Sequence, residues 1–343
     1  MPPLYTDLST SVHLPSSLPP SSSSSITKCA PNAPNAPKCP SDLSPSLRSA
    51  AYLKSLHLCN QLIYSPSVSP LTVEEILEKS RGQELSYDAF LSLLKNVQTE
   101  HVKQTTGLVR SQMTHHFALY RSGKSIIEIS STLNFPPYLL AKQMLENIFP
   151  SPRSRVSTIL KSLPFDPTLS FFSSSPLFSP RPGDFLSPLG PFPLPHFFLS
   201  LAGAVHRDPL NGPLPDRYRR SLGQSYELLL QSSLPTPYLP ESSLRLSGFS
   251  KTPDILLLTP IKLSVTPRSS INILWLDSKA MYGSPEVHAR NLTQARGYVN
   301  RFGPGVIVYW FGHCVEGEED VGVVDGVGEI TTITQSITQL TIN

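Results

Sequence analysis

One stretch decides the fold of this chain. It covers residues 248–312 and reads GFSKTPDILLLTPIKLSVTPRSSINILWLDSKAMYGSPEVHARNLTQARGYVNRFGPGVIVYWFG. Residues 255–258 and 271–276 are short, continuous apolar runs, which are typical of buried strands. Pro260 and the TPRSS cluster at 266–270 are turn signals between them. The stretch therefore predicts two neighbouring strands joined by a turn.

Two acidic residues flank these predicted strands. Asp254 precedes the first strand and Asp277 ends the second, so antiparallel pairing would bring both carboxylates to one end of the sheet. Neighbouring buried acids repel each other unless a cation lies between them. Lys279 follows Asp277 by two residues and so points to the same face of its strand. Two carboxylates, an ammonium group and a divalent ion can bind a phosphodiester and activate water.

This arrangement resembles the PD-(D/E)xK nuclease superfamily. The motif stands here as Pro253-Asp254 followed by Asp277-Ser278-Lys279, and Gln294 and Tyr298 have the spacing of the QxxxY element of RecB-like and exonuclease-like members. Several phrases are also similar to those of the eukaryotic codanin-interacting nuclease family. They are GFSKTPD, SKAMYG, NRFGPGVIVYWFG, Asn211-Gly212-Pro213-Leu214 and Glu227-Leu228-Leu229. The resemblance runs, with gaps, from about residue 86 to about residue 312.

The resemblance implies a role for each of these side chains. Asp254 and Asp277 would bind Mg²⁺ or Mn²⁺, and Glu227 would assist, directly or through water. Lys279 would orient the attacking water or stabilise charge at the phosphorus. Gln294 and Tyr298 would position nucleic acid or Lys279, and Ser278 would offer its main-chain carbonyl.

Simpler interpretations of three of these residues stay open. Glu227 lies on a predicted helix, residues 216–230, and a solvated helix acid would look the same. Gln294 and Tyr298 share one face of a predicted helix and could be ordinary polar packing. Gly223, one turn before Glu227, is interpreted as permitting close helix packing.

The predicted fold class is α+β with two domains. Residues 47–162 are predicted to form a helical domain with a helix-turn-helix. Residues 196–325 are predicted to form a C-terminal PD-(D/E)xK, restriction-endonuclease-like α/β domain with a mixed central sheet, as the resemblance implies. Residues 163–195 are rich in Pro, Ser and Phe and predict a loop insertion, or alternatively a partner-binding segment. Residues 1–46 predict a disordered Ser/Pro-rich tail, and residues 326–343 a C-terminal tail.

Helix starts in both domains carry recognisable N-cap residues. Thr72, Ser86 and Ser125 each precede a helical apolar pattern, and Ser284 precedes Pro285 at the first position of another. Short polar side chains at this place accept hydrogen bonds from the otherwise unpaired N–H groups of the first turn. The sequence therefore predicts where four of the helices begin.

The helical domain contains a candidate nucleic-acid surface. Residues 126–133 and 138–149 are predicted helices joined by the turn at 134–137, and basic residues outnumber acidic ones eight to two between 102 and 162. Such a balance favours a polyanionic partner. We expect Arg121, Lys124 and Lys142 to contact nucleic acid, with Gln143 offered by the second helix. The alternative is a helix pair that packs only on itself or on the sheet.

Composition excludes several other classes of protein. The four cysteines, at 29, 39, 59 and 314, fit no zinc-binding spacing and are expected to be reduced thiols. No signal peptide is apparent at the N-terminus, and the longest apolar stretch, 197–205, is far too short to cross a bilayer. No membrane association is expected.

Together these features predict a Mg²⁺- or Mn²⁺-dependent nuclease that hydrolyses phosphodiester bonds in nucleic acid, with DNA favoured over RNA. The resemblance adds a codanin-like protein partner, and it places the protein in the nucleus and also in the cytoplasm. The alternative is a non-catalytic protein that binds such a partner through a vestigial nuclease fold.

Overall fold

The computed structural model describes residues 45–64, 71–149, 153–180, 184, 194–234, 236–266, 269–317 and 320–326. All of them belong to one compact unit, residues 37–343. The predicted tails at 1–46 and 326–343 lie outside the described residues, apart from residues 45, 46 and 326.

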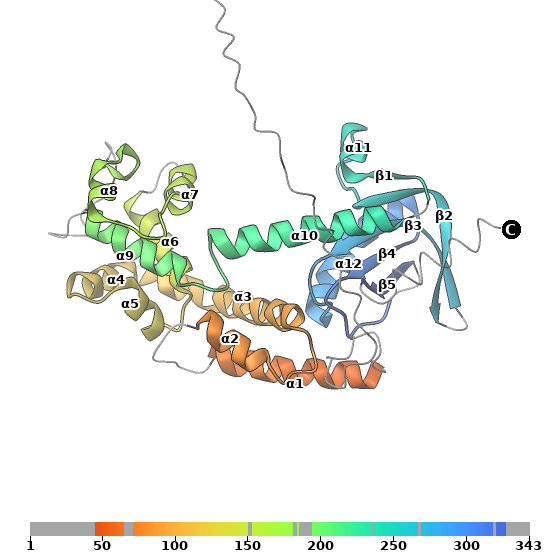
Figure 1. Ribbon diagram of the computed structural model, residues 1–343, viewed down its shortest axis with the longest axis horizontal. Coiled ribbons are helices and arrows are strands. Elements are labelled where there is room, and N and C mark those ends of the chain that lie inside the picture. Colours follow the sequence, from red (N-terminus) through yellow and green to blue (C-terminus); the bar gives the residue numbers. More distant parts are fainter. Residues whose placement is uncertain are drawn as a thin grey trace, which may run out of the picture. The chain divides into compact units, whose positions relative to one another are not determined.

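The described residues form α-helices, one short 3₁₀ helix and a sheet (Figure 1). The helices are α1 (Pro45–Tyr64), α2 (Val73–Ser80), α3 (Tyr87–Ser111), α4 (Met113–Arg121), α5 (Ile126–Thr132), α6 (Pro137–Ile148), α7 (Arg153–Lys161), α8 (Leu169–Ser174), η2 (Pro176–Phe178), α9 (Leu194–His206), α10 (Pro213–Ser233), α11 (Glu241–Leu246) and α12 (Pro285–Phe302). The strands are β1 (Tyr238–Pro240), β2 (Ile255–Thr266), β3 (Ser269–Lys279), β4 (Gly305–Tyr309) and β5 (Val321–Asp325).

The sheet is mixed, as expected. Its strand order is β1-β2-β3-β4-β5, with antiparallel pairing from β1 to β3 and parallel pairing from β3 to β5. The parallel connection from β3 to β4 runs through α12, which is the crossover that parallel neighbours require. The α+β class and the antiparallel pairing of the two quoted strands are therefore confirmed.

The predicted turn at Pro260 is wrong, because β2 continues through it to Thr266. The register with β3 shifts between Leu256, which faces Trp275, and Ile261, which faces Ile273. A proline cannot donate to the ladder, and an irregularity of this kind is where a strand can accommodate one.

The four predicted N-caps are confirmed. The side chains of Thr72, Ser86, Ser125 and Ser284 each accept a hydrogen bond from the main-chain N–H three residues later. Ser125 also forms a complete capping box with Glu128. Short local signals were therefore sufficient to fix where α2, α3, α5 and α12 begin.

Two hydrophobic cores cover the two faces of the sheet. The first contains side chains of α1, α2, α3 and α10 together with Ile255, Val306 and Val308 of the sheet. The second contains α12 side chains together with Trp275 and Ile307. Figure 1 shows α10 lying across the sheet, where it contacts β3. The first three helices thus share a core with the sheet.

A third core joins α4–α9 and the end of α3. Phe172 of α8 and Phe178 of η2 are buried in it and pack against Phe198 of α9, with ring centroids 5.7 Å and 4.8 Å away. The prediction of a loop is therefore wrong for residues 169–178, because its phenylalanines supply core surface without a regular period.

Side-chain contacts also tie α1 to α12, to the loop before α12 and to β5. The ring of Tyr52 stacks on Tyr282 at 6.1 Å, and its hydroxyl donates to Glu286 Oε2 at 3.4 Å. Arg48 Nη1 lies 3.0 Å from Asp325 Oδ2 at the end of β5. No described helix is long and apolar enough to span a membrane.

Candidate active site

Three of the predicted side chains converge at one end of the sheet. Ile255 faces Leu276 in the β2–β3 ladder, so Asp254 lies next to Asp277. Asp254 Oδ2 accepts a hydrogen bond from the main-chain N–H of Ser278 at 2.7 Å. Lys279 Nζ lies 2.5 Å from Asp277 Oδ2. The antiparallel pairing therefore brings together two carboxylates and one ammonium group.

Burial makes this cluster electrostatically strained. The side chains of Asp277 and Lys279 are only 3% and 14% exposed. Burial, and then the charge of Asp277, raises the pKa of Asp254 to about 7, and burial also raises the pKa of Asp277. Burial lowers the pKa of Lys279, but the ion pair with Asp277 and the charges of Asp254 and Glu241 together raise it above its ordinary value. One ammonium group thus faces two carboxyl groups, so the charge of the cluster favours binding of a further cation.

Tyr298 and Gln294 lie beside this cluster on α12. Tyr298 is buried, and burial followed by the charges of Asp277 and Asp254 raises its pKa. Gln294 is exposed and donates from Nε2 to the Tyr298 hydroxyl. The ring of Tyr298 also packs edge-on against Trp275, with centroids 5.3 Å apart. Tyr298 is thus a core residue whose hydroxyl is close enough to sense the two acids.

Glu227 of α10 is within the electrostatic reach of the cluster but has a bond of its own. Burial, then the charges of Glu241 and Asp277, raise its pKa. Its Oε1 accepts from Gln231 Nε2 at 3.2 Å on the same helix. The packing role proposed for Gly223 is wrong, because a Cβ at this position would meet nothing within 4 Å.

Glu241 is a fourth acid at this end of the sheet that the sequence analysis missed. Pro240 of β1 faces Ile255, and the Glu241 N–H donates to the Asp254 carbonyl at 3.0 Å. Glu241 Oε1 accepts from Arg245 Nη2 at 2.7 Å and from Thr252 Oγ1 at 3.1 Å. The available signal was Pro240-Glu241, which repeats the pattern of Pro253-Asp254.

The donor set suits magnesium or manganese, although it is small. Among the residues that the structure describes, no three His, Cys, Asp or Glu side chains form a ready metal-ligand group. Mg²⁺, however, keeps several of its waters and is commonly held by one or two carboxylates. Asp254 and Asp277 are adjacent carboxyl groups, and one cation, Lys279, lies beside them. Their uncompensated negative charge fits such an ion.

The residues predicted to contact nucleic acid lie on or next to α4–α6, whose side chains form the third hydrophobic core. Arg121 and Lys124 are exposed at the end of α4 and before α5. Lys142 Nζ lies 3.9 Å from Glu146 Oε1 on α6. Gln143 is buried and donates to Thr106 Oγ1 at 2.9 Å, so the expectation that it is offered to nucleic acid is wrong.

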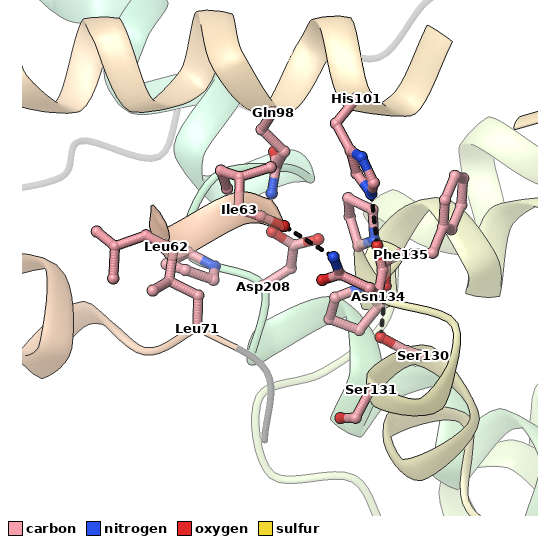
Figure 2. A pocket seen from close by; sticks show the side chains of 13 residues that line it. Leu62, Ile63, Leu71, Gln98, His101, Ser130, Ser131, Asn134, Phe135 and Asp208 are labelled. Atoms are coloured by element: carbon pink, nitrogen blue, oxygen red, sulfur yellow. Dashed lines mark hydrogen bonds between the residues drawn. The ribbon is translucent and has the colours of Figure 1, made fainter. Parts of the chain in front are cut away.

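A small pocket lies near the turn between α5 and α6 (Figure 2). Its volume is about 60 Å³, which is room for a few water molecules. Asn134 donates to the Ile63 carbonyl at 2.8 Å, and its own carbonyl is paired with His101 at 2.8 Å. Asp208 accepts from the N–H of Tyr138 at 3.1 Å. These polar groups are occupied in fixing the turn, so we assign the pocket a structural role.

Comparisons with known proteins agree with the motifs. Residues 198–325 match the family described as "Protein of unknown function TPD sequence-motif", and Thr252-Pro253-Asp254 lies inside that range. The Xenopus laevis protein called CDAN1-interacting nuclease 1 is 31% identical to this chain over 195 residues, which cover 54% of this chain and 55% of the relative. The protein of that name in Bos taurus is 26% identical to this chain over 259 residues, which cover 69% of this chain and 80% of the relative.

The chain spans about half the length of the first of these relatives. No solved structure matches the chain. The resemblance inferred from the motifs is nevertheless confirmed: over half or more of its length this chain is similar to the CDAN1-interacting nucleases, and it carries the TPD sequence motif.

Proposed function

We propose that this protein is a metal-dependent nuclease that hydrolyses phosphodiester bonds in nucleic acid, with DNA preferred over RNA. The observation that carries the proposal is the meeting of Asp254, Asp277 and Lys279 at one end of β2 and β3. The word nuclease in the names of the similar proteins supports it. The further assignment to the PD-(D/E)xK superfamily is part of the proposal.

The residues divide the chemistry among them. Asp254 and Asp277 would hold Mg²⁺ or Mn²⁺, which when bound polarises a phosphoryl oxygen and lowers the pKa of a bound water. Lys279 is protonated, because its pKa is raised, so its ammonium stabilises negative charge on the phosphate rather than accepting a proton. Its ion pair with Asp277 holds that ammonium beside the metal ligands.

The flanking residues have supporting parts in this proposal. Glu227 adds negative charge that favours a cation, directly or through water. Tyr298, held by Gln294, presents a neutral hydroxyl near the acids and would position nucleic acid or Lys279. Arg121, Lys124 and Lys142 would bind phosphates away from the acids, in the helical region.

A protein partner is the second proposal. The similar proteins are called CDAN1-interacting, so we infer that a codanin-like protein binds this chain. We further propose that the chain acts in the nucleus and also in the cytoplasm, because a nuclease acts where nucleic acid is present. If the acids bind no metal, this interaction would be the main function and the nuclease fold would be vestigial.

The test is a thermal-shift titration with Mg²⁺, Mn²⁺ and Ca²⁺, paired with cleavage assays on single-stranded, duplex and branched DNA and on RNA. Wild type should be stabilised in proportion to RT ln(1 + [metal]/Kd), and Asp254→Asn and Asp277→Asn should lose that stabilisation. Asp216→Asn is the matched control, because Asp216 is an exposed acid on α10. No metal-induced shift and no metal-dependent cleavage in wild type would refute the catalytic proposal.

A further inference from the structure

The segment 241–251, which comprises α11 and the loop after it, exposes two large apolar side chains. Leu246 is 91% exposed at the end of α11, and Phe249 is 42% exposed with its ring against Phe302 at 5.3 Å. Figure 1 shows α11 beside β1 at the edge of the sheet. Only Leu244 of α11 is buried. A single exposed leucine is common on protein surfaces, so a ligand is inferred here only together with the basic side chains nearby.

Basic side chains lie in this segment and against it. Arg301 of α12 donates to the Lys251 carbonyl at 3.1 Å and to Ser250 Oγ at 3.3 Å. Both acceptors are neutral, so they fix the guanidinium without cancelling its charge. Lys251 is exposed, and its side chain crosses α12 at Gly297, where an added Cβ would lie 3.2 Å from Lys251 Cδ. Two cations are thus held at the base of the loop.

Arg245 extends this charge towards the acids. Its Nη2 lies 2.7 Å from Glu241 Oε1, and its side chain is 63% exposed. An exposed ion pair of this kind contributes little stability, so Arg245 can exchange Glu241 for a phosphate at small cost. The pair is also joined to the site, because the Glu241 N–H donates to the carbonyl of Asp254 at 3.0 Å.

We propose that segment 241–251 binds a single strand of nucleic acid that leads into the acidic site. Arg245, Lys251 and Arg301 contact successive phosphates, and Leu246 and Phe249 contact the faces of bases. Single strands and frayed ends expose those faces, whereas a duplex hides them in its stack. The inference deepens the proposed nuclease function and rests on it for the identity of the substrate.

Binding is measured in excess EDTA, so that the readout does not depend on cleavage. A fluorescently labelled single-stranded DNA and a duplex of the same sequence are titrated with wild type and with Leu246→Ala, Arg245→Ala and Lys251→Ala, over a range of salt. The matched controls are Leu228→Ala, which removes a leucine 63% exposed on α10, and Lys262→Ala, which removes an exposed lysine of β2. Arg301 is kept because it anchors the loop.

We expect Leu246→Ala to weaken single-strand binding by about tenfold, which is the scale of losing about two buried methylene groups from an apolar contact. Arg245→Ala and Lys251→Ala should each lower the slope of log K against log salt by about 0.7. The two control variants should bind as wild type does. Segment variants that bind single strand as the controls do, or that lose as much duplex binding as single-strand binding, would overturn the inference.

The outcome separates this inference from the proposed function. If segment variants lose binding but wild type cleaves nothing with any metal, the strand-binding surface stands and the hydrolytic proposal fails. If wild type cleaves and the segment variants bind as wild type does, the hydrolytic proposal stands and the strand-binding proposal fails.

Discussion

The carboxylate of Asp254 accepts a 2.7 Å hydrogen bond from the main-chain N–H of Ser278, a residue 24 positions further along the chain. Ser278 stands between Asp277 and Lys279, so the acid of one strand is bonded to the centre of the motif on the next. The two halves of the proposed active site are therefore held together by the sheet itself and need no bound ion to assemble.

Replacing Asp254 by Asn should leave the fold intact and stabilise the protein in metal-free buffer. The amide oxygen can still accept from Ser278, while the repulsion between Asp254 and Asp277 disappears. We expect the Tm to rise by about 2–4 °C for each kcal/mol of repulsion relieved, in buffer above pH 7, where Asp254 carries its charge. Thermal unfolding in EDTA measures this, with Asp216→Asn as the control. A drop in Tm would mean that Asp254 makes a stabilising contact as a charged group.

Lys279→Ala should separate metal binding from catalysis. Removing the ammonium takes a positive charge from beside the acids, so the affinity for Mg²⁺ should stay the same or increase. Cleavage should fall by about two to four powers of ten, as for the loss of a group that stabilises transition-state charge. Thermal-shift titration and single-turnover cleavage measure the two effects separately. Equal losses in both would show that Lys279 supports the structure of the site instead.

Gly305→Ala should be strongly destabilising. A Cβ at this position would lie 2.1 Å from Cδ2 of Trp275, and the indole cannot move easily because its Nε1 donates to the Gly303 carbonyl at 2.8 Å. Overpacking of this kind costs about 1–3 kcal/mol. Urea unfolding measures it. Gly223→Ala is the control, since its Cβ meets nothing within 4 Å and it should stabilise α10 by up to about 1 kcal/mol.

Asp325 should contribute more to the stability of the fold in mild acid than at neutral pH, whereas most paired carboxylates show the opposite dependence. Burial raises its pKa to about 6, although Arg48 opposes this, and His313 Nε2 and Tyr282 also face it. Because the folded state holds this proton more tightly than the unfolded state, the contribution of Asp325 is fully present below about pH 4 and is lost as the pH rises to about 6.

The measurement compares the free energy of unfolding of wild type and Asp325→Asn between pH 4 and pH 7. Wild type should lose stability relative to the variant as the pH rises from about 4 to about 6, and the difference should then level off towards pH 7. Repeating the comparison with His313→Gln in both proteins removes any contribution from the imidazole. A difference that grows in favour of wild type as the pH rises would contradict the burial argument.

The cations of the helical region should contribute unequally to nucleic-acid binding. Arg121→Ala and Lys124→Ala should each lower the salt slope of duplex binding by about 0.9, because both side chains are exposed. Lys142→Ala should have a smaller effect, because Glu146 already lies 3.9 Å from that ammonium. Lys54→Ala, an exposed lysine of α1, is the control. Unchanged slopes in all variants would confine binding to the sheet end of the molecule.

The parts of the fold that the sequence predicted are those with local or periodic signals. The two strands, their antiparallel pairing and the N-caps required only apolar runs, turn residues and short polar side chains. The prediction that residues 255–258 are buried throughout is wrong at Leu258, which is 57% exposed. Asp254 and Asp277 could be placed together because strand ends meet when a hairpin closes. Tyr298 could be placed on the correct side because helix spacing alone defines its face.

The missed parts depend on contacts that leave no local pattern. β1 has three residues, too few for a periodic signal, so the Pro-acid pair at 240–241 was the available signal for an acid beside Asp254. Phe172 and Phe178 enter a core without periodic spacing. The sequence indicated that Gln143 was available to contact nucleic acid. It is instead buried where it donates a hydrogen bond to Thr106 of α3, and only the tertiary arrangement reveals this.

The register shift in β2 has a consequence for engineering. It separates the pairs Ile255–Leu276 and Leu256–Trp275, which hold the acids, from the pairs that begin at Ile261–Ile273. A change in length on the far side of the shift need not be transmitted to the near side, because the two stretches of ladder keep independent registers. The distal end of this hairpin is accordingly the place to graft a peptide tag or reporter while preserving the spacing of Asp254 and Asp277.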